Sequence, residues 1–188
     1  MNNKAILTGK IINKEFSHKV KEKTFLKLTV ASTRMSGTID LVPVIIEEEK
    51  VFPEIQSLKI IGEARTINLD KQLKVFIFAK SIEPLMGFNS MDINEIELEG
   101  TICKPVNKRE TPKKRKIADI LLAVNGNHKK SYYFPCLAWG KLANLSQSLE
   151  VGDKVNLKGR FQSRIYLKGE EEKTTYEISI SNLIPLVE

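Results

Sequence analysis

The segment Asn3-Lys-Ala-Ile-Leu-Thr-Gly9 returns later in the chain as Asn94-Glu-Ile-Glu-Leu-Glu-Gly100, with the shared pattern N-x-x-x-L-x-G. Three further pairs of similar segments follow in the same order: 42–45 with 134–137, 59–62 with 156–159, and 82–85 with 183–186. Ordered matches of this kind are the signature of an internal repeat. The sequence therefore predicts two copies of one module, residues 1–87 and 92–188, joined by the turn-rich segment 86–92.

Each module has the alternating apolar and polar pattern of β-strands, with many β-branched and aromatic residues. The expected strands are 25–32, 39–46, 58–69 and 73–80 in the first module, and 95–103, 117–125, 132–139, 154–166 and 174–180 in the second. One helix is expected at 140–149, after the third strand. Five strands with a helix after the third are typical of an OB barrel. The predicted fold class is all-β, with two tandem OB-fold barrels of five strands, each with a short helix.

The composition is that of an ordinary globular protein, because 41% of the 188 residues are hydrophobic and 28% are charged. No stretch is long and apolar enough for a transmembrane helix or a signal peptide, so we expect a cytoplasmic protein that does not contact a membrane. The net charge of +7 is compatible with a polyanionic partner. Only two cysteines, Cys103 and Cys136, are present, which excludes a disulfide framework.

Motifs for catalysis or metal binding are missing from the sequence. It contains no glycine-rich phosphate loop, no H-E-x-x-H and no G-x-S-x-G. His18, His128 and the two cysteines lack the spacing of metal ligands. Acidic residues such as Glu47–Glu49 are consecutive, which does not suit a catalytic pair. We expect no enzyme activity, no catalytic residue, no cofactor and no metal site.

The stretch Lys154–Lys168 predicts a strand with one basic face, since strand side chains alternate between two sides. Val155, Leu157, Gly159 and Phe161 would face the core. The other side would carry Lys154, Asn156, Lys158, Arg160, Gln162, Arg164, Tyr166 and Lys168. A solvated charged face is the alternative interpretation. The absence of acidic residues from these eight positions favours a binding surface.

Aromatic residues are expected beside this basic strand. In the strand 132–139, Phe134, Cys136 and Ala138 suit the barrel core, so Tyr133 and Trp139 would point outward. Single-stranded nucleic acid needs such a surface, because rings stack on bases and cations follow phosphates. For Trp139 alone, a position in the core or at an interface is the alternative.

A basic segment between the first two strands of the second module would add charge to this surface. The flexible loop expected at 107–116 and the turn after it contain Arg109, Lys113, Lys114, Arg115, Lys129 and Lys130. Such an arm can lie along a phosphate backbone and release counterions. The alternative is a hairpin tip that only improves solubility.

Residues 94–184 resemble the bacterial single-stranded DNA-binding proteins. The matching elements are Asn94-x-x-x-Leu98-x-Gly100, Leu121–Asn125, Trp139-Gly-Lys-Leu-Ala143, Gly159–Tyr166 and Thr174–Glu177. The resemblance implies that Trp139, Tyr133 and Tyr166 are base-stacking residues, and it places Lys141 next to them. The two-copy layout is similar to the tandem-OB members of this family in low-GC Gram-positive bacteria and their mobile elements.

The resemblance implies sequence-tolerant binding of single-stranded DNA in DNA replication, recombination or repair. Family members commonly end in a disordered tail with an acidic tip that recruits partners, whereas this sequence ends in Pro185-Leu-Val-Glu188. The resemblance leaves replication or repair proteins open as partners, but we expect no acidic C-terminal tail to recruit them. Two alternatives stay open: an OB-fold protein–protein accessory module of a primosome or conjugation system, and an RNA-binding OB protein.

The first module has lost the residues that would bind DNA in the second. The repeat aligns Glu47 with Trp139, Glu63 with Arg160, and Ile67 with Arg164. Carboxylates at these places would repel phosphates, so we expect a degenerate module with a structural or protein-contact role. We expect its aromatic residues to pack in the core or in loops; they are Phe16, His18, Phe25, Phe76 and Phe78.

Outward isoleucines in the first module predict self-association. Ile61 and Ile67 would lie on the strand face where the second module has Lys158 and Arg164. Exposed apolar patches often mark an interface. Family members with one barrel per chain typically form tetramers, and the resemblance therefore implies a homodimer for a chain with two barrels. The alternative is a monomer in which these isoleucines are covered within the chain.

Overall fold

The computed structural model describes residues 3–51, 56–69, 72–85, 91–126 and 130–186, with only the backbone described at 165–168 and 171. The first half forms β1 (Asn3–Val20), β2 (Lys23–Thr33), β3 (Ile39–Glu47), the 3-10 turn η1 (Glu48–Lys50), β4 (Ser57–Leu69) and β5 (Gln72–Pro84). The second half forms β6 (Asn94–Ile102), β7 (Asn107–Glu110), β8 (Lys116–Asn125), β9 (Ser131–Trp139), α1 (Lys141–Leu145), η3 (Ser146–Ser148), β10 (Lys154–Lys168) and β11 (Glu171–Pro185). No helix within the described ranges is long and apolar enough to span a bilayer.

Both halves close into barrels with the same strand order. In the first, β1 pairs with both β2 and β4, and β3 pairs in parallel with β5. In the second, β6 pairs with both β8 and β10, and β9 pairs in parallel with β11. The predicted all-β fold with two tandem OB barrels is confirmed. The expected helix after β9 is present, but it consists of one α-helical turn followed by a 3-10 turn.

The region expected to be a basic loop is instead a β-hairpin. β7 pairs with β8 from Asn107, opposite Asp119, to Glu110, opposite Lys116. The turn between them is closed by hydrogen bonds from the Thr111 amide to the Arg115 carbonyl (2.9 Å) and from the Arg115 amide to Thr111 Oγ1 (3.1 Å). In the first barrel the equivalent hairpin is formed by two long strands, β1 and β2. The expectation of a flexible arm is therefore wrong. The segment forms two paired strands with a hydrogen-bonded turn between them.

The repeated Asn and Gly residues have the same structural role in both barrels. The Asn3 side chain bonds both the amide and the carbonyl of Ala64 on β4 (each 2.9 Å). The Asn94 side chain does the same to Phe161 on β10 (2.9 and 2.8 Å). In each barrel the residue held by this asparagine clamp lies two positions after a glycine, Gly62 or Gly159. A Cβ at either glycine would lie 2.3–2.5 Å from a carbonyl oxygen of the neighbouring strand. The backbones approach too closely there for any side chain.

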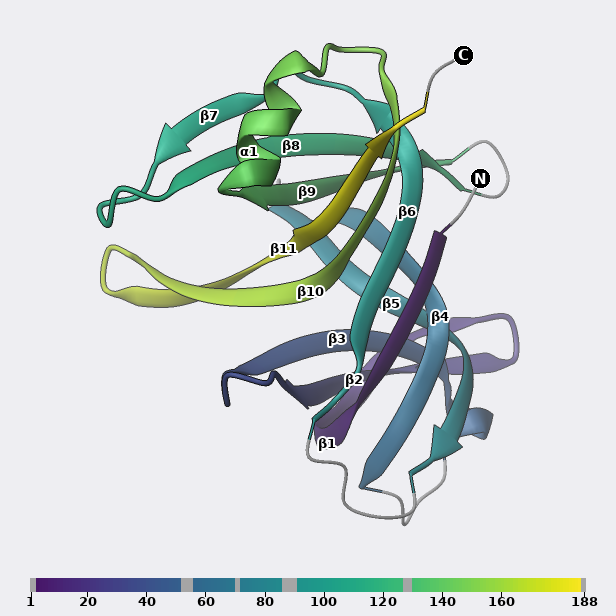
Figure 1. The fold of residues 1–188 in the computed structure, drawn as a ribbon. Helices are drawn as coiled ribbons and strands as arrows, with labels where there is room; N and C mark the ends of the chain where they lie inside the picture. Colours follow the sequence, from purple (N-terminus) through teal and green to yellow (C-terminus); the bar gives the residue numbers. More distant parts are fainter. Residues whose placement is uncertain (1–2, 52–55, 70–71, 86–90, 127–129, 187–188) are drawn as a thin grey trace.

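The two barrels join through their first strands, β1 and β6, which run antiparallel next to each other (Figure 1). Asn3 lies opposite Leu98, and Leu7 lies opposite Asn94, so the repeated residues exchange places across the junction. This is the pattern of a twofold axis. The two barrels are therefore related by an internal twofold axis, and one eleven-stranded sheet runs through both.

Polar contacts at the junction repeat the same symmetry. The Leu41 amide on β3 donates to Ser163 Oγ on β10, and the Tyr133 amide on β9 donates to Thr66 Oγ1 on β4 (each 3.0 Å). Thus the third strand of each barrel rests on the fourth strand of the other. Among the residues that the structure describes, the junction has a buried acid on one side alone, Asp40, which has no exposed surface.

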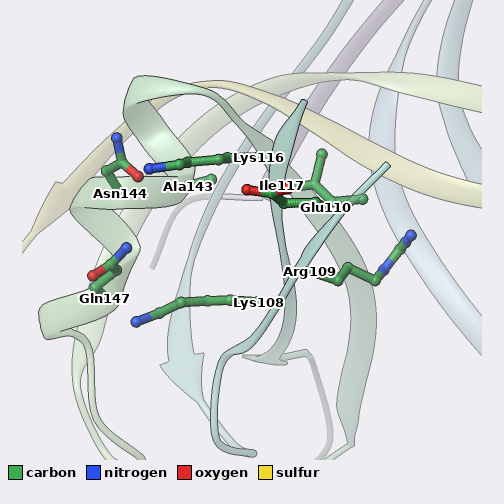
Figure 2. A pocket seen from close by; sticks show the side chains of 8 residues that line it. All are labelled: Lys108, Arg109, Glu110, Lys116, Ile117, Ala143, Asn144 and Gln147. Atoms are coloured by element: carbon green, nitrogen blue, oxygen red, sulfur yellow. The ribbon is translucent and has the colours of Figure 1, made fainter. Parts of the chain in front are cut away.

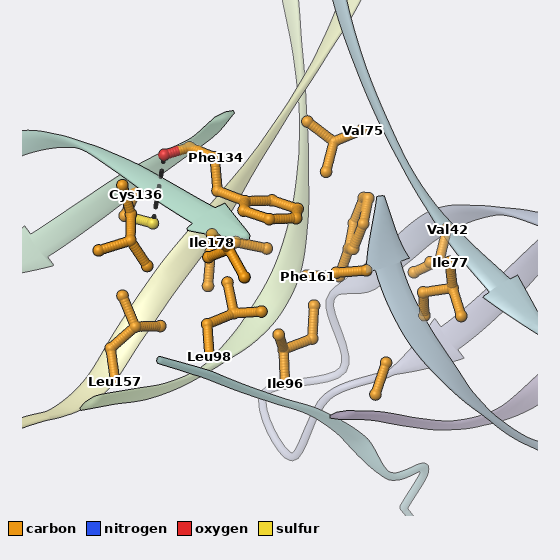
Figure 3. Packing of buried hydrophobic residues seen from close by; sticks show 14 of the residues in the cluster. Val42, Val75, Ile77, Ile96, Leu98, Phe134, Cys136, Leu157, Phe161 and Ile178 are labelled. Atoms are coloured by element: carbon orange, nitrogen blue, oxygen red, sulfur yellow. Dashed lines mark hydrogen bonds between the residues drawn. The ribbon is translucent and has the colours of Figure 1, made fainter. Parts of the chain in front are cut away.

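The core is continuous across the junction. Buried residues of both barrels belong to one cluster, in which Phe134 and Phe161 are the largest fully buried side chains. Figure 3 shows residues of this cluster from both barrels, with the Phe161 ring toward the middle of the view. As predicted, Phe134, Cys136 and Ala138 face this core. Strand alternation consequently turns their neighbours on β9 outward.

Candidate nucleic-acid interface

The two aromatic residues predicted to stack on bases lie on the outer face of β9. Tyr133 is 46% exposed and Trp139 is partly exposed, with Pro135 and Leu137 between them on the same face. Six residues of strand separate their Cα atoms by about 20 Å. Rings spaced in this way along one face can each take a different base of an extended strand.

Two cations near Trp139, Arg109 and Lys141, differ in whether a neighbouring carboxylate already pairs with them. Arg109 on β7 and Trp139 on β9 both lie next to Ile117 of β8, one on each side. Both guanidinium contacts of Arg109 go to Asp119, from Nε (2.6 Å) and from Nη2 (3.0 Å). This hydrogen bond to Asp119 raises the pKa of Arg109. Lys141, the first residue of α1, is exposed and forms no ion pair with any described residue.

The outward positions of β10 do not form one basic surface. Lys158 faces β6 and pairs with Glu97 (3.5 Å). Arg160 is partly buried at the junction between the barrels, where burial, followed by the charge of Arg34, lowers its pKa. Arg164 is exposed, opposite Thr175 of β11. Of these three predicted contacts, Lys158 and Arg164 are exposed, and Arg160 is partly buried.

Acidic side chains from neighbouring strands lie among the cations. Glu177 on β11 accepts a hydrogen bond from Gln162 Nε2 (3.2 Å). Burial raises the pKa of Glu177, and the charge of Arg164 acts in the opposite direction. Together with Asp119, this carboxylate reduces the positive charge of the outer face. Asp119 and Glu177 were not predicted at this surface, because the neighbours of each strand depend on the closure of the barrel. The alternation of residues 117–125 and 174–180 was the signal that could have revealed them.

The remaining predicted contacts fall into two groups. Lys113, Lys114 and Arg115 in the β7–β8 turn, and Lys130 before β9, are exposed. Lys129 and the side chains of Tyr166 and Lys168 lie outside the described residues; β10 includes the backbone of the latter two.

The first barrel presents paired acids where the second presents Trp139 and Arg160. The ladder places Glu47 opposite Phe25, as it places Trp139 opposite Ile117. Glu47 pairs with Lys23 (2.6 Å) and Lys50 (3.9 Å). Similarly, Glu63 pairs with Arg65 (2.7 Å) and Lys80 (3.6 Å). Each carboxylate is therefore balanced by two cations, which limits the repulsion that it exerts on a phosphate.

The aromatic residues that the structure describes in the first barrel lie on strands, outside its core, whereas we expected them to pack in the core or in loops. The rings of His18 and Phe25 stack with centroids 4.8 Å apart and 4° between their planes. Phe25 also contacts Phe78 (5.9 Å), and the guanidinium of Arg65 lies 3.8 Å above the Phe78 ring. We call His18, Phe25 and Phe78 the outer ring cluster. Phe16, on the same strand as His18, is 67% exposed.

Neither thiol shows the features of a metal ligand or a nucleophile. Burial raises the pKa of Cys103 and of Cys136. In the part of the chain that the structure describes, no group of three or more His, Cys, Asp or Glu side chains could hold a metal ion. The outer face of the second barrel combines aromatic rings with cations, the two kinds of group that single-stranded nucleic acid requires.

Comparison with protein families gives a match for the second barrel. The model described as the single-strand binding protein family matches residues 93–186, half of the chain. The chain belongs to the single-strand binding protein family. The matched residues start at β6 and include both Tyr133 and Trp139. The first barrel lies outside the match, in line with the changes at Glu47 and Glu63.

Similar proteins include the single-stranded DNA-binding protein of Malacoplasma penetrans, 42% identical over 65 residues, which are 33% of this chain and 34% of that protein. Single-stranded DNA-binding protein 1 of Streptococcus pyogenes is 36% identical over 81 residues, 39% of this chain and 62% of that protein. The chain therefore spans between about one third and three fifths of these curated relatives. The predicted resemblance to the family of low-GC Gram-positive bacteria is confirmed.

Both barrels together resemble a solved structure. The wild-type single-stranded DNA binding protein from Thermus aquaticus superposes with a TM-score of 0.80 at 19% identity, covering 100% of this chain and 94% of that chain. At this identity the likeness establishes the fold. It shows that the pair of barrels, and not only each barrel, has a known counterpart.

Proposed function

We propose that the chain binds single-stranded DNA with little sequence preference, through the outer face of its second barrel. The observation that carries this proposal is the placement of Tyr133 and Trp139 on one face of β9 in the barrel that matches the family. Bases would stack on these rings, while Lys141, Arg164 and the cations of the β7–β8 turn would meet phosphates. Titration of oligo(dT) against the emission of Trp139, the only tryptophan, tests it: binding should quench the emission.

In this role the chain would act in the cytoplasm, in DNA replication, recombination or repair, as a binding protein without catalytic activity. RNA offers the same bases and phosphates, so competition between oligo(dT) and oligo(U) separates the DNA-binding role from the RNA-binding alternative.

The salt dependence of binding is a second expected result. If the cations of the outer face meet phosphates, the logarithm of the association constant should fall linearly with the logarithm of salt concentration, by about 0.7 per phosphate contacted. Titrations of oligo(dT) over a series of sodium chloride concentrations measure this slope. An affinity that is independent of salt would contradict electrostatic contact with the strand.

We further propose that the two barrels have different roles. The double variant Lys141→Ala/Arg164→Ala in the second barrel should weaken oligo(dT) binding, because both cations are exposed on the proposed face. The matched variant Lys27→Ala/Lys80→Ala in the first barrel should leave it unchanged, because these lysines already pair with Glu15 and Glu63. Equal losses in both variants would mean that the first barrel also binds the strand.

A specific observation favours protein contact as the role of the first barrel. The outer ring cluster combines partly exposed rings with charges that are already paired, and such a surface suits an uncharged partner better than a polyanion. This is the part of the accessory-module alternative that the geometry supports.

We also propose that the chain forms a homodimer. Ile61 on β4 and Ile6 on β1 face each other on the outside of the sheet, and Ile67 is 46% exposed. A second copy would cover these side chains. Light scattering after size exclusion should give about twice the chain mass of 21.3 kDa. Ile61→Lys should shift the species toward monomer, whereas Ile12→Lys on the β1–β2 hairpin should not. A 21 kDa species for the unaltered chain that still binds DNA would contradict the proposal.

A further inference from the structure

A cavity of about 250 Å³ lies between the β7–β8 hairpin and the helix of the second barrel (Figure 2). The hairpin contributes Lys108, Glu110, Lys116 and Ile117 to its lining, and the helical segment contributes Ala143, Asn144 and Gln147. Arg109 also borders the cavity, but Figure 2 shows its guanidinium directed away from the helix, consistent with its two hydrogen bonds to Asp119. The cavity is thus separate from the Arg109–Asp119 pair.

The polar groups around the cavity suit an anion. In Figure 2, the side chains of Lys108 and Lys116 extend from the hairpin toward the helix that carries Asn144 and Gln147. Within the described parts of the chain, neither lysine has an ion pair, and neither amide side chain has a hydrogen bond. Glu110 is the one acid among the described lining residues. Two ammonium groups against one carboxylate leave the lining positive, with amide donors beside them.

Gly140 follows Trp139 in the sequence and bonds two residues that line the cavity. The Gly140 amide, next to Trp139, donates to the Lys116 carbonyl (2.9 Å), and the Gly140 carbonyl accepts from the Asn144 amide (3.1 Å). A Cβ at Gly140 would meet no atom within 4 Å, so the surface above it is open. The ladder places Trp139 on the face of Arg109 and Ile117, and Lys108 and Lys116 on the opposite face. A strand that leaves Trp139 would therefore reach the lysines by crossing the end of β9 at Gly140, where no side chain lies in its way.

We propose that this cavity binds a phosphate group of the single strand that stacks on Trp139. The ammonium groups of Lys108 and Lys116 carry the charge interaction, and the amides of Asn144 and Gln147 donate hydrogen bonds to phosphate oxygens, as these side chains do in other nucleic-acid complexes. The inference rests on the proposed binding of single-stranded DNA. It gives the phosphate contact to two lysines without ion pairs among the described residues, and not to Arg109, whose Nε and Nη2 already bond Asp119.

The test compares charge-matched variants of the full chain. The association constant of fluorescently labelled oligo(dT) is measured by anisotropy over a series of salt concentrations. For Lys108→Ala/Lys116→Ala, the slope of log affinity against log salt should become shallower by about 0.7, the value for one phosphate. The control Lys10→Ala/Lys104→Ala removes two exposed lysines outside the cavity and should retain the slope of the unaltered chain. Asn144→Ala/Gln147→Ala should lower the affinity at every salt concentration with the slope unchanged, because neutral groups release no counterions.

A 5′-phosphorylated oligo(dT) identifies the source of the phosphate. Tighter binding than its 5′-hydroxyl counterpart, lost in the lysine variant, would assign the cavity to a terminal phosphate, and equal binding together with the shallower slope would assign it to an internal one. An unchanged slope in the lysine variant, with binding and Trp139 quenching intact, would overturn the cavity proposal alone. Absence of oligo(dT) binding by the unaltered chain would overturn the proposed function and this inference with it.

Discussion

Substitution of Arg34 by leucine is expected to lower the free energy of unfolding by about 3–5 kcal/mol, the usual loss when one partner of a buried ion pair is removed. Arg34 holds the fully buried carboxylate of Asp40 with both Nε (2.6 Å) and Nη2. Without it, the one hydrogen bond left to Asp40 within the described ranges is that from the Ser163 amide (3.3 Å). A buried carboxylate with so few partners is costly, because it has lost its hydration.

Urea denaturation followed by circular dichroism measures this loss. The double variant Arg34→Leu/Asp40→Leu should recover much of it, because it removes both buried charges together. Lys59→Ala provides a control on an exposed pair, with Glu83 at 3.8 Å, and should cost less than about 1 kcal/mol. A loss of similar size in Arg34→Leu and Lys59→Ala would show that the Asp40 pair does not stabilise the junction.

Removal of the Trp139 ring is expected to weaken binding of oligo(dT) by about 1–3 kcal/mol, which corresponds to about a 5- to 150-fold loss of affinity. The ring offers a partly exposed surface beside Lys141 and the β7–β8 hairpin, where a base can stack. Because Trp139→Ala has no tryptophan left, its affinity must be measured by anisotropy of a labelled oligonucleotide.

Two controls accompany this variant. Trp139→Phe keeps an aromatic face and should retain most of the affinity. Phe16→Ala removes a ring that is 67% exposed in the first barrel and should have no effect on binding. Full-affinity binding by a folded Trp139→Ala protein would exclude this residue from the site and leave Tyr133 as the aromatic residue to test next.

The stacking residues and the cations differed in how far they could be predicted. Tyr133 and Trp139 were correctly placed on an outer face, because alternation with Phe134, Cys136 and Ala138 depends only on the period of a strand. The electrostatic surroundings of the cations were not predictable in the same way. Lys158 is balanced by Glu97 of β6, and Arg109 by Asp119 of β8. Which strands are neighbours depends on the closure of the barrel.

The outer ring cluster illustrates the same limit. Phe25 lies on β2 and Phe78 on β5, and their contact depends on the position of β3 between those strands. From the sequence, such rings are typical of a core. In the structure, smaller side chains such as Leu28, Val44 and Ile77 fill the interior instead. The aromatic residues are therefore left on the outside, where they meet Arg65.

The duplication, most of the strands, the two OB barrels and the family of the second barrel were predictable from the sequence, whereas β1 and β7 were not among the expected strands. These features depend on local pattern: the clamp residues Asn3 and Asn94 and the close-approach glycines Gly62 and Gly159 act within one barrel each, so the repeat exposes them. Two features could be recognised in the tertiary structure but not in the sequence. One is the junction, where Asp40 is buried beside Arg34 and Arg160, and the other is the cavity between the β7–β8 hairpin and the helix. Both bring together elements that are distant in the sequence: Asp40 of the first barrel meets Arg160 and Ser163 of the second, and the hairpin meets the helix. The packing of these elements depends on the closure of both barrels and not on the local sequence pattern.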